Sequence, residues 1–258
     1  MLQLRNVKKE FIDKSGKKLP VIDNVTISIR QGEFVSFLGP SGCGKTTLIN
    51  IIAGLVTTSS GTVLVNGKTI NSPGLDRAVV FQDSCLLPWL TVRENVGMAL
   101  NSDNSGKEKI CDYYIDMVKL NRFKSAYPHQ LSGGMKQRVA LARALATDSP
   151  VLLMDEPFSA LDEQTRMLLQ NELMQIWQRT NKTIVFVTHN IREAIFLSDR
   201  VLLLSHHPAK IISEIAIPDI RPRVGGEHFF NMEAEILLHL KREIEKATEE
   251  ELGERYIL

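Results

Sequence analysis

The spacing of apolar and polar residues along the first third of the chain predicts β-strands. Residues 25–29 alternate strictly, and residues 33–38 form an almost continuous apolar run. Residues 61–65 are also typical of a strand and end at Asn66-Gly67, a typical signal for a tight hairpin turn. A glycine-rich loop follows residue 38 and leads into apolar spacing typical of a helix over about residues 45–53.

The middle of the chain, from about residue 88 to residue 150, has a different pattern. Helical periodicity runs over residues 91–100, 107–119 and 134–146, and strand signals are few. Because strands flank this stretch on both sides, the pattern predicts a helical insert and not a separate domain.

From residue 151 onward, short apolar runs alternate with longer amphipathic stretches. This rhythm predicts parallel strands buried on both faces and connected by helices. The predicted elements are strands at 151–154, 183–187 and 200–204 and helices at 161–178 and 192–197. Beyond Pro218 the pattern loosens. A charged amphipathic helix is predicted over about 232–246, with Leu237, Leu240 and Ile244 on one face.

Composition narrows the class of protein. The chain has 258 residues, 43% of them apolar and 24% charged, so it can bury a sizeable core. Its formal net charge of +1 gives no reason to expect a nucleic-acid partner. Three cysteines fit no zinc spacing, which favours a reducing compartment. No apolar run has the length of a signal peptide or a membrane span, so we expect a cytoplasmic protein that reaches a membrane only through a partner.

The segment Gly39-Pro-Ser-Gly-Cys-Gly-Lys-Thr46 matches the phosphate-binding loop G-x-x-x-x-G-K-[ST], and it lies between a predicted strand and a predicted helix. Glycines let successive backbone N–H groups turn toward phosphate oxygens, and the helix N-terminus adds positive potential. The alternative is a glycine-rich turn with an unrelated lysine. The residues expected to bind nucleotide phosphates are Gly39, Pro40, Ser41, Gly42, Cys43, Gly44, Lys45, Thr46 and Thr47.

A pair of acidic residues follows the apolar run 151–154. Asp155 would lie at the carboxyl end of a buried strand, where α/β sheets place ligand sites, and would hold Mg²⁺ together with the Thr46 hydroxyl. Glu156 is a candidate to polarise the attacking water. An apolar run ending in Asp-Glu is a weak signal alone, but it becomes strong beside a phosphate loop.

Ser132-Gly133-Gly134 precedes the helix predicted from residue 134 and forms a second potential anion-binding helix start. The phosphate loop already supplies one anion-binding helix N-terminus for a bound nucleotide. The second would have a function if it contacts a nucleotide bound by another copy of the chain. The alternative is an ordinary serine N-cap with a flexible entry.

Taken together, these motifs resemble the ABC ATPase family over nearly the whole chain. Residues 131–135 resemble its LSGGQ signature, with Met135 in place of the final Gln. Phe11 resembles the aromatic residue that stacks on adenine, with a core strand residue as the alternative. Gln82 resembles the glutamine that contacts Mg²⁺ and the attacking water. Residues 159–162, ending in Asp162, resemble the loop that crosses between monomers. His189 resembles the histidine that contacts the γ phosphate.

The resemblance implies an α/β P-loop NTPase (ABC ATPase) core with a mostly parallel sheet, an N-terminal antiparallel β subdomain and a helical insert. It implies one ABC ATPase domain over 1–258, with a helical subdomain at about 88–150 and a helical tail at about 220–258. ATP and Mg²⁺ would be the cofactors. Two copies would pack head to tail, and each ATP would lie between the phosphate loop of one copy and Ser132, Gly133 and Gly134 of the other. Glu156, His189 and Gln82 would be catalytic, and Thr46, Gln82 and Asp155 would bind the metal.

Three segments, 81–92, 155–166 and 196–205, resemble the importer ATPases for nitrate, sulfonates and taurine. In that branch the subunit lies on the inner face of the membrane against permease subunits and depends indirectly on an extracytoplasmic solute-binding protein. Leu87-Pro-Trp89 would suit a groove that receives a permease helix, with burial of Trp89 in the core as the alternative. Bicarbonate or a thiamine precursor are alternative solutes. The C-terminal helix is expected to serve packing or dimer support.

Three rival functions follow from the same motifs. The first is a non-transport ABC ATPase, although the chain has one cassette and no sustained heptads. The second is a P-loop kinase or GTPase, although residues 180–183 lack the Asp of a guanine-reading N-K-x-D motif. The third is a non-catalytic interaction subunit.

Overall fold

The computed structural model describes residues 1–98, 100, 106–218, 221, 223 and 225–255. Its contacts divide the chain into two compact units, each with its own strands and helices. The first unit combines Met1–Gly74 with Thr183–Leu258, and the second is Leu75–Lys182. The predicted bounds of the helical subdomain and of the C-terminal tail stay predictions.

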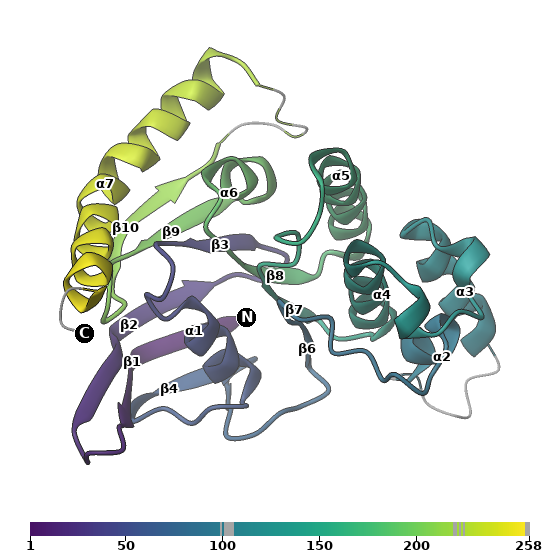
Figure 1. The fold of residues 1–258 in the computed structure, drawn as a ribbon, viewed down its shortest axis with the longest axis horizontal. Coiled ribbons are helices and arrows are strands. Elements are labelled where there is room, and N and C mark those ends of the chain that lie inside the picture. The colour runs from purple at the N-terminus through teal and green to yellow at the C-terminus, as the bar shows by residue number, and fades with distance from the viewer. Residues whose placement is uncertain (99, 101–105, 219–220, 222, 224, 256–258) are drawn as a thin grey trace. The chain divides into compact units, whose positions relative to one another are not determined.

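An antiparallel sheet forms the N-terminal part of the first unit, as the family resemblance implied. Its strand order is β2-β1-β4-β5, and Figure 1 shows its three longer strands side by side. The turn between β4 and β5 places Asn66 at φ 50° and Gly67 at φ 77°. These left-handed conformations suit the Asn-Gly pair and confirm the predicted hairpin. The strands are β1 Leu2–Ile12, β2 Lys18–Ile29, β4 Ser60–Val65 and β5 Lys68–Thr69.

A second group of strands in the first unit contains the predicted parallel pairs. Strand β3 pairs in parallel with both β8 and β9, and every residue of β3 and β8 is buried. A further strand, β10, was not predicted, and it pairs antiparallel with β9. The strands are β3 Phe34–Leu38, β8 Thr183–Thr188, β9 Arg200–Leu204 and β10 Ile211–Ala216, and the helices of this unit are α1 Lys45–Ala53, α6 Ile191–Leu197 and α7 Glu227–Arg255.

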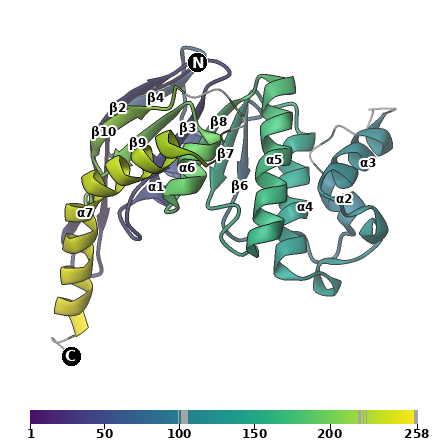
Figure 2. The same ribbon diagram turned by 90° about the horizontal axis from the view of Figure 1, so that it is seen from above.

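Helix α7 begins earlier and ends later than predicted, and of the predicted apolar face only Leu240 is buried. Met232, Ile236 and Leu240 are buried against β9, β10 and α6, where Figure 2 shows α7 crossing those elements. Leu237 is 50% exposed and Ile244 is 41% exposed, so both point away from the core. Two apolar stripes lie about a quarter turn apart on this helix, and periodicity alone did not decide which one the sheet covers.

The second unit consists of the predicted helices and one pair of parallel strands, β6 and β7. Its helices share a buried core that includes Val96, Ile115 and Val139, which confirms a helical insert between strands. The predicted helix 91–100 is shorter here, and residue 99 lies outside the described residues. The elements are β6 Arg77–Val80, α2 Val92–Gly97, α3 Lys107–Met117, the 3₁₀ turns Asn121–Phe123 and Pro128–Gln130, α4 Gly133–Ala146, β7 Val151–Asp155 and α5 Glu163–Thr180.

Membrane-spanning segments were searched for among the described residues. None of their helices combines the length and the apolar character needed to cross a bilayer.

Candidate nucleotide site

The phosphate loop leaves the carboxyl end of β3 and enters α1, in the strand–loop–helix order predicted from the sequence. Gly44 is the N-cap of α1 with φ 113°, and a Cβ atom there would lie 3.0 Å from the Val21 carbonyl oxygen. Only glycine fits this position without strain. Since glycine has no side-chain acceptor, the first N–H groups of α1 stay directed toward the loop, which suits an anion.

The Lys45 ammonium group lies inside the phosphate loop. Lys45 is only 5% exposed, and its Nζ donates to the carbonyl oxygens of Gly39 at 2.9 Å and Pro40 at 2.7 Å. These bonds place a positive charge where the loop curls around a phosphate. Thr46 is exposed and Thr47 half-buried in the first turn of α1.

The remaining loop residues contribute unequally. Ser41 and Gly42 are exposed and Pro40 is half-buried, and Gly42 has φ 75°. The Cys43 side chain is fully buried beneath the loop, with its Sγ 3.1 Å from the position of a Cβ built on Gly39. Cys43 therefore supports the loop through its side chain, and only its backbone can face a phosphate.

His189 emerges beside the phosphate loop. In the register of β3 with β8, Leu38 is the partner of Thr188, so the loop after Leu38 and His189 leave neighbouring strands at the same edge. Adjacent strands are separated by about 4.8 Å. His189 is exposed, whereas Thr188 before it is buried. The structure thus brings two predicted phosphate contacts of the first unit together.

Phe11 lies on β1 and is 41% exposed, so the alternative of a core strand residue is wrong. The Lys9 ammonium nitrogen lies 4.8 Å from the centre of the Phe11 ring. A cation over an aromatic face is a favourable contact. The ring remains accessible enough for a flat ligand to stack on it.

Within the second unit, β6 and β7 bring Gln82, Asp155 and Glu156 together. Val80 pairs with Met154, so the segment after β6 and the end of β7 leave the sheet side by side. Asp155 is 2% exposed, Glu156 is half-buried and Gln82 is exposed. Glu156 has φ 45°, an uncommon conformation for a side chain larger than glycine that turns the chain sharply at the strand end.

The oxygen donors in this set fit a magnesium ion by their chemistry. Asp155 offers a carboxylate, Gln82 a side-chain carbonyl and, in the first unit, Thr46 a hydroxyl. Mg²⁺ prefers hard oxygen ligands and usually takes only one or two carboxylates besides phosphates and waters.

Ser132 begins α4 and Asp162 begins α5. The Ser132 hydroxyl accepts a hydrogen bond from Met135 N at 3.3 Å, so Ser132 is the N-cap of α4, as the alternative interpretation of this segment expected. Ser132 and Gly133 are nevertheless exposed, and a Cβ atom on Gly133 would meet nothing within 4 Å. A Cβ atom on Gly134 would lie 2.9 Å from Leu161 Cδ2, so this glycine allows close packing against the chain before α5.

Asp162 acts as the N-cap of α5, and its carboxylate accepts a bond from Thr165 N at 2.9 Å. Hydrogen bonding to Thr165 lowers the pKa of Asp162 below its ordinary value. This cap therefore contributes stability above the ordinary carboxyl pKa and loses it as the pH falls. The residue is exposed, which leaves room for the predicted contact with a second copy.

Two residues that support the candidate site residues were not identified from the sequence. Gln137 Nε2 donates to the Phe81 carbonyl at 2.9 Å, directly before Gln82, and no sequence signal marked it. Asn190 caps α6, with its Oδ1 accepting from Arg192 N and Glu193 N. The spacing Asn190-x-x-Glu193 is a capping pattern that could have been recognised.

A phosphate loop after a buried parallel strand and an Asp-Glu pair at the end of another buried strand define a P-loop nucleoside triphosphatase. A sequence model of the ABC transporter family matches residues 22–159. The chain belongs to this family, and it is an ATP-binding cassette ATPase.

Relatives span most of the chain. It is 47% identical over 250 residues to the uncharacterized ABC transporter ATP-binding protein MJ0412 of Methanocaldococcus jannaschii, covering 95% of this chain and 93% of that protein. It is 43% identical to the nitrate import ATP-binding protein NrtC of Synechococcus elongatus over 94% of this chain, but it spans 38% of the length of that longer protein. It is 43% identical to the aliphatic sulfonates import ATP-binding protein SsuB of Bacillus subtilis, covering 84% of this chain and 86% of that protein.

A solved structure agrees with the fold. The dimeric post-hydrolysis structure of the ATP-binding cassette MJ0796, bound to ADP and Pi, has a TM-score of 0.77 and 33% identity. The match covers 85% of this chain and all of that chain. The predicted family, fold class and ATPase activity are therefore confirmed, and the kinase, GTPase and non-catalytic alternatives are wrong.

Proposed function

We propose that this chain is the ATP-hydrolysing subunit of an importer and works as a head-to-tail pair with a second copy. The observation that carries the proposal is the second helix start, Ser132-Gly133-Gly134, which is exposed although Lys45 and its loop already supply a phosphate site. A second phosphate-binding helix N-terminus on one chain has a function when it contacts ATP bound by another copy. The dimeric structure of the MJ0796 cassette supports pairing of two copies.

Each residue of the site has a role in this proposal. The loop from Gly39 to Thr47 binds the phosphates, with Lys45 at the β and γ positions, and Phe11 stacks on adenine. Thr46, Gln82 and Asp155 bind Mg²⁺. When bound, the ion neutralises developing charge on the phosphates. From the other copy, Ser132, Gly133 and Gly134 donate to the γ phosphate, and Asp162 lies at the contact between copies.

Glu156 and His189 act on the hydrolysis step. Glu156 accepts a proton from the attacking water, and His189 donates a hydrogen bond to the γ phosphate. The sharp turn at Glu156 supports this role because strained backbone is concentrated at functional positions. The closed pair binds ATP more tightly than the open pair does. This difference in affinity drives movement of the permease.

Transmembrane permease subunits are the proposed partners, with an extracytoplasmic binding protein acting through them, so the chain would lie on the inner face of the membrane. Support comes from Trp89, which is 68% exposed, so its alternative as a core residue is wrong. An exposed tryptophan after Gln82 suits a helix-in-groove contact. No nucleic-acid partner is proposed.

The transported solute would be a small molecule of the nitrate, sulfonate or taurine type. Relatives named for nitrate and for aliphatic sulfonates are each 43% identical to this chain, so identity does not choose between them. This follows physically because the motor subunit never contacts the solute. The import names of these relatives also favour a transporter over a non-transport ABC ATPase.

The shared site is tested with Ser132→Arg, which places a bulky side chain at the second helix start. We expect ATP turnover to fall by about 100-fold or more, as for loss of a transition-state donor, while each chain still binds nucleotide. Turnover is measured by phosphate release and binding by a fluorescent ATP analogue. The control Gln178→Arg adds the same side chain to an exposed position near the C-terminal end of α5, away from Asp162.

Mixing variants sharpens this test. A Ser132→Arg chain retains Lys45, and a Lys45→Ala chain retains Ser132, so a mixed pair contains one complete shared site. The mixture should hydrolyse ATP faster than either variant alone. Normal turnover by Ser132→Arg, or a mixture no faster than its components, would contradict the proposal.

A further inference from the structure

Helix α6 follows His189 directly and is too short to hold its own position. It has seven residues, Ile191–Leu197, and therefore extends about 10 Å. Helices of this length are marginal unless other elements fix them. The buried face of α6, which includes Ala194 and Ile195, and the contacts at its two ends together fix where the chain around His189 lies.

At the N-terminal end, the residues on either side of His189 are tied to the first turn of α6. Thr188 Oγ1 accepts from Asn190 N at 3.0 Å and donates to Glu193 Oε2 at 2.7 Å. Thr188 is 2% exposed and Glu193 is 7% exposed. Because these bonds connect the residues on both sides of His189 to the first turn of α6, we expect a displacement of α6 to displace His189.

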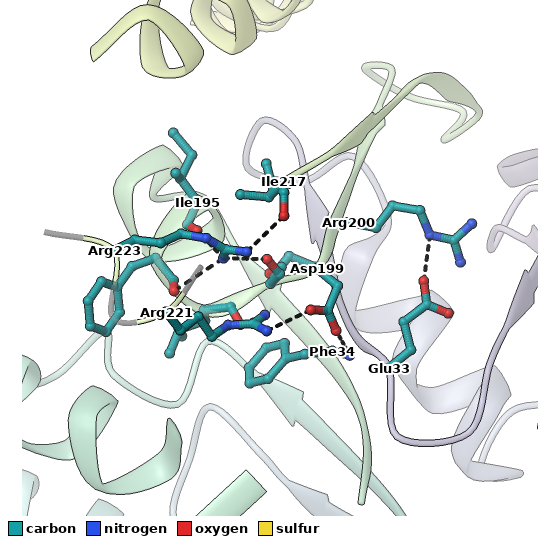
Figure 3. A network of polar contacts seen from close by, with 12 residues as sticks. Glu33, Phe34, Ile195, Asp199, Arg200, Ile217, Arg221 and Arg223 are labelled. Carbon is teal, nitrogen blue, oxygen red and sulfur yellow. Dashed lines mark hydrogen bonds and ion pairs between the residues drawn. The ribbon is translucent and has the colours of Figure 1, made fainter. Parts of the chain in front are cut away.

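At the C-terminal end, two arginines from the chain before α7 bind the last carbonyl groups of α6 (Figure 3). Arg223 donates to Ile195 O at 2.8 Å and also to Ser198 O, and its second nitrogen donates to Ile217 O at 2.9 Å. Arg221 donates to Leu197 O at 2.7 Å and forms an ion pair with Asp199. Cations at a helix C-terminus are favourable because the helix dipole is negative there.

Because Arg223 is buried, its guanidinium group can occupy only a narrow range of positions. The residue is 6% exposed, and a buried guanidinium must keep its acceptors because leaving one unmade is costly. A shift of α6 along its axis would break these bonds. Helix α7 adds a second contact, since Arg192 of α6 pairs with Glu233 of α7 at 2.8 Å.

We propose that Arg223 is a positioning residue for His189, acting through α6 from about 10 Å away. The inference rests on the role of His189 proposed above. Arg223 contacts neither the phosphate loop nor His189 in its described bonds. Its effect therefore appears in the hydrolysis step and not in the binding of ATP.

The first test compares Arg223→Gln with Arg200→Gln. Arg200 is also largely buried in the first unit and pairs with Glu33 and Glu214, but none of its described bonds reaches α6. We expect Arg223→Gln to lower kcat by about tenfold, since small misplacement of a catalytic group is costly, with KM for ATP nearly unchanged. Arg200→Gln should change neither. Equal effects of the two variants, or a rise in KM alone, would overturn the inference.

A double-mutant cycle separates positioning from general structural damage. In the His189→Ala background, Arg223→Gln should lower the single-turnover rate by less than about twofold, because its effect passes through the missing histidine. A full further loss would overturn the inference. Normal hydrolysis by His189→Ala would overturn the proposed role of His189 as well, whereas slow His189→Ala with normal Arg223→Gln would overturn only this inference.

A second variant keeps the test informative if Arg223→Gln does not fold. Arg223→Lys retains a charged donor near Ile195 O and should lower kcat relative to the wild type, but by less than about tenfold; an unchanged kcat would overturn the inference. It can replace the glutamine variant in the same cycle. Circular dichroism and thermal unfolding of each variant check that its fold is retained.

Discussion

At the residue scale, Asn190 fixes the start of the helix that follows His189. Its Oδ1 caps α6 by accepting from two backbone N–H groups. An asparagine or an aspartate supplies this oxygen acceptor, whereas an apolar side chain does not.

The N-cap formed by Asn190 predicts different outcomes for two substitutions at this position. Asn190→Asp should retain stability or gain a few tenths of a kcal/mol, because a carboxylate also favours the positive end of the helix dipole. Asn190→Leu should cost about 1 kcal/mol, the usual cost of losing an N-cap. Urea unfolding at neutral pH measures both, and equal stabilities would show that the cap contributes nothing.

At the scale of elements, the segment between β6 and α2 is irregular yet firmly held. Asn95 of α2 is fully buried, accepts from Leu87 N at 2.9 Å and donates to Leu87 O and Leu90 O. Arg143 of α4 donates to Ser84 O and Cys85 O. These bonds hold the backbone around Trp89 in place, and the Trp89 side chain is exposed to solvent. A binding surface that is ordered before its partner arrives loses less conformational freedom on binding.

Trp89→Ser should therefore weaken assembly with the permease while the ATPase activity of the isolated chain stays unchanged. Loss of a large aromatic side chain at the centre of an interface commonly costs 2 kcal/mol or more, roughly a 30-fold loss of affinity. Co-purification with permease-containing membranes measures the effect. Leu75→Ser is the control, since Leu75 lies in the same unit and is 94% exposed. If both variants assemble normally, the docking surface is elsewhere.

At the scale of the whole molecule, the proposed mechanism couples hydrolysis to reopening of the pair. If Glu156 accepts the proton of the attacking water, its loss should stop the reaction after closure. The bound ATP would then keep the two copies together, because it contacts both.

Glu156→Gln should accordingly bind ATP, hydrolyse it very slowly and accumulate as a pair of chains. Size-exclusion chromatography with light scattering in Mg-free ATP measures the mass, and adding Lys45→Ala, which removes phosphate binding, is the control. A Glu156→Gln chain that stays monomeric with saturating ATP would count against the mechanism.

The sequence by itself determined most of the strands and helices, the phosphate loop and the family, because these depend on local spacing and on short motifs, whereas β6 and β10 were not predicted. Tertiary structure decided which apolar stripe of α7 is buried, since Leu237 and Leu240 are equally apolar and only packing against β9 and β10 separates them. It also decided that Phe11 and Trp89 are exposed, and that β10 completes a sheet edge. The bonds from Arg221, Arg223 and Asn95 to distant carbonyl groups had no sequence signal, because long-range contacts arise only when the chain is folded.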